Sequence, residues 1–281
     1  MRKLSMAGLL AVLFVTGYGA NQRLEGLETG EPDRDHLLYL PSGRLLRVLS
    51  LGQDDTLADL IYLWSIQYYG YYQGGVRYDY LMQIYDRVIT ELDPRFQDAY
   101  LLGAMILSME AQRHDEALQL LDKGIRENPG DWLLPFEAGF IAYSSLRDYR
   151  RAAAYFRVAM ERPGVSPVVR RFYAEMFNRM GDPRTSLQHW NEILDTAGSD
   201  YVRRIASRHV RDLTTKVRRA DLQAAVDAFR DARGHPPARL QDLVDADLLP
   251  QIPLDAEGRP FRYDPAAGAV QPPEGASGFV P

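Results

Sequence analysis

Hydrophobic positions recur at helical spacing, in short paired segments, between Asp54 and Gly198. In the clearest pair, small and aromatic residues stand at offsets that let two antiparallel helices pack closely, and a proline closes the unit: Phe136, Gly139, Phe140, Tyr143, Ala152, Phe156, Ala159 and Pro163. This pattern predicts an all-α array of helical hairpins over residues 54–198. A generic helical bundle is the alternative interpretation of the same periodicity.

The order of small, aromatic and proline residues resembles one tetratricopeptide (TPR) repeat of about 34 residues. The flanking segments carry similar orders, and roughly three repeats are needed before such a stack is stable. Upstream, the matching residues are Tyr100, Gly103, Ala104, Leu107, Ala117, Leu121, Gly124 and Pro129; downstream, they are Ala174, Phe177, Ser186, Trp190 and Ile193. A further apolar pair runs from Leu57 to Leu92 and is closed by Pro94. The resemblance implies a TPR-like solenoid that binds proteins and carries no chemistry of its own.

The TPR resemblance also implies where a partner binds, because TPR repeats bind ligands on the concave face formed by the first helix of each pair. In the register set by Phe136 and Ser186, this face receives Glu137, Ser144, Arg171, Glu175 and Asn178. Arg171 is the strongest candidate, since a guanidinium can hold a partner carboxylate with two hydrogen bonds. Substitutions at these positions are expected to be nearly neutral for folding.

Residues 199–233 are predicted to form one long helix that caps the last repeat. An apolar stripe with spacings of four and three runs along it through Ala206, Val210, Leu213, Val217, Ala220 and Ala224. Gly234, followed by two prolines, ends the helix. The first half is strongly basic and contains Arg203, Arg204, Arg208, Arg211, Lys216, Arg218 and Arg219. This basic patch is either a solvated face or a contact for anionic lipid or an acidic partner.

The N-terminus has the order of a bacterial secretory signal, in which Arg2 and Lys3 precede an apolar run from Leu4 to Val15 and small residues follow. The run is shorter than the roughly 17 residues that a membrane-spanning helix needs. Residues 1–20 are therefore predicted to be a signal peptide, with an uncleaved membrane anchor and a buried helix as alternatives. The expected location is the periplasm, either free or attached to the inner membrane. The chain has no cysteine, which excludes disulfides and lipoprotein acylation.

Residues 21–53 are predicted to be an extended linker with an acidic, turn-rich start. Its apolar residues are expected to pack along the first helices, because such side chains are seldom left exposed together: Leu45, Leu46, Val48, Leu49 and Leu51. The densest aromatic cluster follows, with Tyr68, Tyr71 and Tyr72 as its candidate surface residues. Tyrosine clusters occur at protein interfaces and at membrane headgroup level, and a glycan is a further possible ligand. Packing in the repeat core is the alternative.

Residues 234–281 are predicted to form a small tail with a short hairpin. A turn at Asp255 to Gly258 precedes a strand at Phe261 and Tyr263, and Ala269 begins the returning strand. The order of these residues resembles the C-terminal segment of major pseudopilins of type II secretion systems. Pseudopilins place calcium near this region, so the resemblance implies possible carboxylate ligands at Asp255, Glu257 and Asp264. A plain polar turn is the favoured interpretation.

The sequence shows no catalytic constellation. No His-Glu-x-x-His run, Gly-x-Ser-x-Gly elbow or phosphate-binding loop occurs, and the five histidines lack metal-ligand spacing. A net charge of -5 does not favour nucleic acid as a partner. The sequence therefore predicts a non-enzymatic scaffold, without cofactor or metal, in a cell-envelope complex such as secretion or pilus machinery. Alternatives are a module that binds a glycan or lipid through its Tyr-rich first repeat, and a hydrolase whose residues meet only in the fold.

Overall fold

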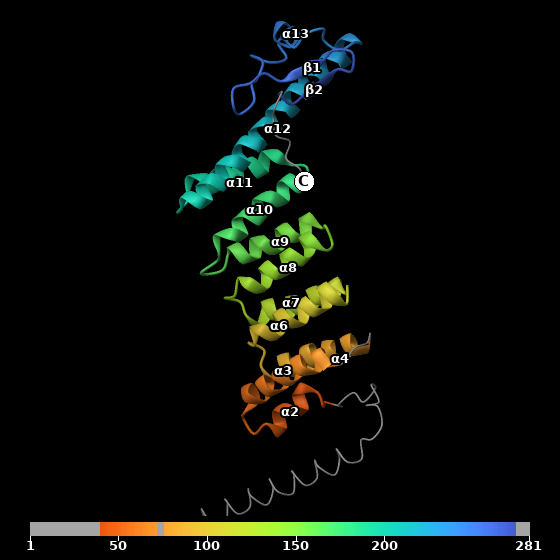
Figure 1. Ribbon diagram of the computed structural model, residues 1–281, viewed down its shortest axis with the longest axis vertical. Coiled ribbons are helices and arrows are strands. Elements are labelled where there is room, and N and C mark those ends of the chain that lie inside the picture. The colour runs from red at the N-terminus through yellow and green to blue at the C-terminus, as the bar shows by residue number, and fades with distance from the viewer. Residues whose placement is uncertain (1–39, 72–75, 274–281) are drawn as a thin grey trace, which may run out of the picture.

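The computed structural model describes residues 40–71 and 76–273, which form a line of stacked helices with a small hairpin at one end (Figure 1). The predicted signal segment, residues 1–20, and Tyr72 lie outside the described residues. Among the helices that are described, none is long and apolar enough to cross a membrane.

Successive helices pair as antiparallel hairpins from the N-terminal end up to one long helix, Asp200–Arg233. The elements before that helix are α2 (Gly43–Leu49), α3 (Asp54–Tyr71), α4 (Val76–Ile84), the π-helical turn η1 (Tyr85–Ile89), α5 (Thr90–Leu92), α6 (Gln97–Met105), the π-helical turn η2 (Ile106–Glu110), α7 (His114–Glu127), α8 (Leu133–Ser144), α9 (Tyr149–Met160), α10 (Pro167–Arg179) and α11 (Pro183–Asp195). The last elements are α12 (Asp200–Arg233), α13 (Gln241–Asp245), β1 (Arg262–Asp264) and β2 (Ala269–Gln271). This order confirms the predicted all-α, TPR-like architecture.

Small residues in one helix face large residues in the next, as the repeat pattern predicts. A Cβ atom at Gly139 of α8 would lie 2.6 Å from Phe156 Cε1 of α9. One at Gly103 of α6 would lie 2.7 Å from Leu120 Cδ2 of α7. Real Cβ atoms do not approach this closely, so glycine is what lets these helix backbones come together. Phe156 is fully buried as a result.

The apolar segment before the first repeat forms helix α2, with Ser42 as its N-cap. Gly43 packs against the backbone of Val88 and the Glu91 side chain, and Leu46 joins the core. The other apolar side chains of the segment are exposed, namely Leu45, Val48, Leu49 and Leu51. The expectation that they pack along the first helices was therefore wrong, because α2 has only one inward face and these residues stand on the other.

Helix α12 buries opposite faces in its two halves. The first half joins the α11 core through Ala206 and Leu213, as the apolar stripe predicts. The second half instead buries Leu222, Val226 and Phe229 against the C-terminal tail. Ala220 and Ala224 are exposed, so the predicted continuation of the stripe was wrong. The reason is visible in Figure 1, where α12 extends past the last repeat and the tail covers its far end.

The tail forms the predicted hairpin, with Tyr263 of β1 opposite Val270 of β2. Asp255 is 2% exposed, and its carboxylate accepts the backbone N–H groups of Glu257 and Arg259 at 2.9 and 2.7 Å. The Arg259 guanidinium also pairs with it, at 2.8 Å. Asp264 accepts from backbone N–H groups of its own turn. These carboxylates are occupied by the chain itself, which favours the polar turn over calcium ligation. Within the described residues no group of three His, Cys, Asp or Glu side chains is placed to hold a metal.

Candidate partner-binding surface

Arg171, Glu175 and Asn178 form one polar stripe along α10. They are spaced i, i+4 and i+7, which places them on the same side of the helix. The Ser166 side chain caps the start of α10, and Pro167 stands in its first turn, so the sequence specifies where this helix begins. All three stripe residues are partly exposed. The structure therefore brings together the α10 residues that were predicted to face a partner.

Glu175 is held in a network of polar contacts within the chain. Arg179 Nε donates to its carboxylate at 3.0 Å and Asn178 Nδ2 donates at 3.3 Å. Lys216 of α12 in turn donates to Asn178 Oδ1 at 2.7 Å. The Glu175 side chain is only 15% exposed. Replacing Glu175 would leave Arg179 without its carboxylate, so the expectation of near-neutral substitution does not apply to Glu175.

Arg171 differs from Glu175 in its polar contacts. Among the described residues no carboxylate forms an ion pair with it, and its Nε atom is buried without a hydrogen-bond partner. A buried donor without a partner typically costs about 1–3 kcal/mol. Arg171 thus keeps an unneutralised positive charge and unused hydrogen-bonding capacity beside the Glu175 network.

Helix α12 places His209 next to the α10 stripe. The His209 ring stacks on Trp190 of α11, with 3.9 Å between ring centroids and 7° between planes. Burial lowers the pKa of His209 below its ordinary value, while the charge of Glu175 acts to raise it and that of Arg171 to lower it. His209 is therefore within electrostatic reach of both α10 side chains, and burial favours its neutral form.

The sequence contained a signal for this α12 contribution that we missed. Equivalent positions in successive TPR-like repeats are about 34 residues apart. By this spacing His209 is equivalent to Glu175, and Asp212 is equivalent to Asn178. Helix α12 therefore continues the series of first helices as well as capping the last repeat. Treating it as a cap with a separate basic patch left His209 and Asp212 out of the candidate partner site.

On α8, the predicted residues Glu137 and Ser144 share a stripe with Phe140, since the spacing is i, i+3 and i+7. Burial raises the pKa of Glu137. The Ser144 hydroxyl donates to the Phe140 carbonyl at 2.7 Å, so its proton is used within the helix. Phe140 is 39% exposed and its ring lies 5.9 Å from that of Phe172 on α10. Phe140 is an exposed aromatic residue that our site prediction omitted.

We group these stripes as one candidate surface, which we call the first-helix face; the Phe140–Phe172 ring contact links α8 with α10, and the Lys216–Asn178 hydrogen bond links α10 with α12. It consists of Glu137, Phe140 and Ser144 on α8, Arg171, Glu175 and Asn178 on α10, and His209, Asp212 and Lys216 on α12. Its α8 side is aromatic and its α10 and α12 side is charged.

The predicted aromatic surface is not formed by Tyr68, which is 4% exposed and belongs to the core. Its ring packs against those of Trp64 and Tyr80 at 5.3 and 5.2 Å. Tyr68 therefore follows the alternative of core packing. Tyr71 ends α3 and its side chain is not described, so its surface role stays a prediction.

The predicted basic patch divides into residues with different roles. Arg218 donates to the carbonyl groups of Leu254 and Asp255 and so anchors the tail, and Lys216 contacts Asn178. Arg203 pairs with Asp200 at 2.9 Å and Arg219 is partly buried. Three exposed arginines remain on the outward side of α12, namely Arg204, Arg208 and Arg211. Lipid contact through them stays a prediction.

Comparison with known proteins gives a likeness to a solved structure. No family model matches the chain, and no curated protein matches it. The chain is similar to the crystal structure of a thermophilic TPR protein of Thermus thermophilus, with 18% sequence identity and a TM-score of 0.36 over 60% of this chain and 96% of that one. The TPR-like fold is therefore established by the helix pairs and their packing, and no partner follows from the likeness.

Proposed function

We propose that this chain is a non-enzymatic scaffold that binds a protein partner on its first-helix face within a cell-envelope complex. The observation that carries the proposal is Arg171, which has no ion pair within the described chain and a buried Nε without a partner. Its neighbours Glu175 and Asn178 are already engaged with Arg179 and Lys216. A carboxylate from a partner would pair with the exposed part of the Arg171 side chain, since the residue is partly exposed and the buried Nε is out of a partner's reach.

The proposed contact has two parts. Arg171 binds a partner carboxylate through charge-assisted hydrogen bonds, which are about twice as strong as neutral ones. Phe140 supplies an exposed aromatic surface one repeat away, where a partner's apolar side chain packs. The buried Tyr68 removes one of the three tyrosines on which the alternative of glycan or lipid recognition rested.

Arg171→Glu is expected to weaken partner capture by at least about tenfold, because it replaces the binding charge with a repelling one. The matched control is Arg170→Glu, which makes the same change at the preceding, exposed position of α10, off the stripe. Both proteins are crosslinked in envelope fractions and the captured partner is quantified. Melting temperatures are recorded alongside. Equal capture by wild type and Arg171→Glu would rule out this surface.

Envelope location is a separate part of the proposal, supported by Arg2, Lys3 and the apolar run from Leu4 to Val15. A reporter that is active only outside the cytoplasm, fused after Asn21, is expected to be active. The control carries Leu9→Arg and Leu10→Arg, which interrupt the apolar run and are expected to abolish that activity. A wild-type fusion that is present in the cell but has an inactive reporter would refute export, and mass spectrometry of the mature N-terminus separates cleavage from anchoring.

A further inference from the structure

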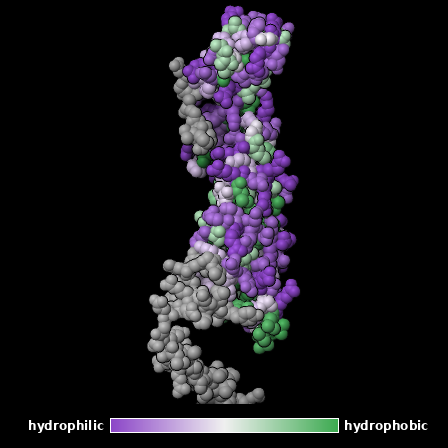
Figure 2. All heavy atoms as spheres, turned by 90° about the vertical axis from the view of Figure 1, so that its right-hand side faces the viewer, coloured by the Kyte–Doolittle hydropathy of each residue, from purple (hydrophilic) through white to green (hydrophobic). Residues whose placement is uncertain are grey.

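The N-terminal end of the solenoid carries a concentrated apolar surface. Helix α2 exposes Leu45, Val48 and Leu49, spaced i, i+3 and i+4, and Leu51 just after it is 90% exposed. Helix α3 exposes Leu60, Leu63 and Ile66 along its outer side. Figure 2 shows apolar residues gathered at this end of the molecule. We call these seven residues the N-terminal apolar face.

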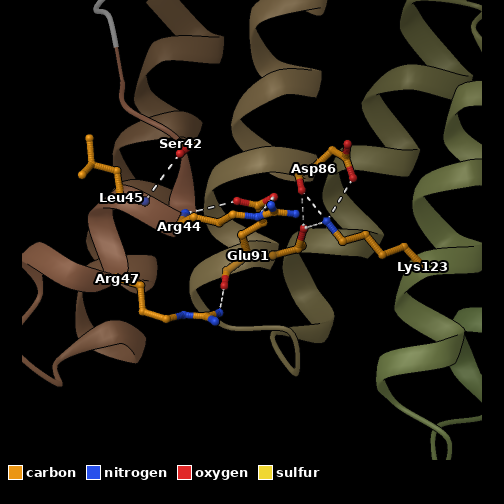
Figure 3. Close-up of polar contacts among 8 residues, drawn as sticks. Ser42, Arg44, Leu45, Arg47, Asp86, Glu91 and Lys123 are labelled. Carbon is orange, nitrogen blue, oxygen red and sulfur yellow. Dashed lines mark hydrogen bonds and ion pairs between the residues drawn. The ribbon is translucent and has the colours of Figure 1, made fainter.

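Helix α2 is fixed to the first repeat, so its outward face is a defined surface. Figure 3 shows Arg44 and Arg47 reaching Glu91, with the Arg44 N–H donating to the Glu91 carboxylate at 3.2 Å and the Arg47 guanidinium donating to the Glu91 carbonyl. Gly43 is buried against the same segment. The inner side of α2 is therefore occupied, Leu46 packs against the core, and Leu45, Val48 and Leu49 are exposed on the other side.

The two ends of the solenoid differ in a way that concerns assembly. Terminal repeats of solenoids need a polar outer face to remain soluble as single units. At the C-terminal end, α12 supplies one through Arg204, Arg208 and Arg211. At the N-terminal end, the outer face is apolar instead. Within the part of the chain that the structure describes, the apolar surface is therefore concentrated at one end, which does not favour open head-to-tail stacking of copies.

The charges around the apolar face are complementary to one another. Asp55 and Asp59 are exposed on the stripe of α3 that also carries Leu63 and Ile66, since the spacing is i, i+4, i+8 and i+11. Helix α2 contributes Arg44, whose side chain is 87% exposed and lies 3.8 Å from the Glu91 carboxylate. A two-fold axis that set α2 of one copy against α3 of the other would bring arginine near aspartate twice. An interfacial membrane helix would carry Lys or Arg where α3 carries these aspartates.

We propose that the N-terminal apolar face is the interface of a two-fold, head-to-head dimer of this chain. Leucine and valine side chains form its centre, and the Arg44 and Asp55–Asp59 groups form its rim. This inference is independent of the first-helix face, which lies on other elements and stays free in such a dimer.

The test is the mass of the full chain in solution, measured by light scattering on a sizing column. Wild type is expected at twice the chain mass of 31.9 kDa. Val48→Glu and Leu63→Glu are expected to shift the protein to the single-chain mass, because each buries a charge in the interface. The matched control is Met109→Glu, at a residue of η2 that is exposed to a similar extent as Val48 but lies outside the face. It is expected to stay dimeric.

All variants keep residues 1–39, so self-association through that segment would be common to all of them. Circular dichroism melts check that each variant folds. A monomeric wild type, or a dimer that survives both Val48→Glu and Leu63→Glu, would overturn the proposal. If wild type is monomeric and sediments with vesicles of phosphatidylethanolamine and phosphatidylglycerol while Leu63→Glu does not, the face contacts membrane and the dimer is refuted.

Discussion

Phe156→Ala is expected to lower the free energy of unfolding by about 3–5 kcal/mol. Phe156 of α9 is fully buried, and its ring lies against Gly139 of α8. The centre of its ring is 5.7 Å from that of Phe136 on α8 and 5.5 Å from that of Phe172 on α10. Truncation leaves a cavity that rigid helix pairs cannot close, because the backbone of α8 is held at its distance by neighbouring contacts. The measurement is urea denaturation followed by circular dichroism.

The matched control for this experiment is Phe140→Ala, which removes the same type of side chain from a more exposed position on α8. Phe140 is 39% exposed and keeps ring contacts with Phe136, Tyr143 and Phe172, so the expected loss is smaller than that for Phe156 but not zero. If the two variants lost the same free energy of unfolding, the contact between Gly139 and Phe156 would not stabilise the stack of helices more than a surface aromatic residue does. Partner capture by Phe140→Ala is expected to fall by more than its limited loss of stability explains, which separates the core aromatic from the surface aromatic.

The helix pairs could be predicted from the sequence because the information for them is local. Gly139 and Phe156 make one close contact within a single hairpin, so their spacing in the sequence is enough to predict it. The α10 stripe follows from helical spacing alone. The face reversal of α12 could not be predicted in this way. Ala220 and Ala224 fit the stripe as well as Leu213 does, and only the position of the tail decides which side of the helix is buried.

The site was only partly predictable for the same reason. Helical spacing places Arg171 on the same stripe as Glu175 and Asn178, and its role in binding stays a prediction. That Arg179 and Lys216 pair with Glu175 and Asn178, and that Arg171 has no ion pair among the described residues, could not be predicted from this spacing. The exposure of Leu51 and the burial of Tyr68 both run against the simplest expectation for their surroundings in the sequence. In each case a contact between distant segments, or the absence of one among the described residues, outweighs the local pattern.

Asp255→Ala is expected to destabilise the C-terminal tail by about 2–4 kcal/mol, because it removes a buried acceptor from two backbone N–H groups and one guanidinium. The tail has its own core of Leu222, Phe229, Leu243 and Phe261, so it can open while the repeats stay folded. Hydrogen exchange of tail residues measures this opening. The matched control is Glu257→Ala, whose carboxylate also contacts Arg259 but is 55% exposed, and its expected cost is below about 1 kcal/mol.

The same carboxylate makes tail stability depend on pH. Burial alone would raise the pKa of Asp255, but the hydrogen bonds from Arg259 and Glu257 and the charge of Arg259 outweigh it, and the pKa is lowered. The open tail has the ordinary Asp pKa of about 3.9. The stabilisation is therefore complete above about pH 4 and is lost as pH falls through the lower folded-state pKa. Wild-type protection of the tail should fall over that acidic window, while in Asp255→Ala protection is lower throughout and loses this dependence. A wild-type tail whose protection, corrected for intrinsic exchange, does not change there would show that the Arg259 contact contributes little to its stability.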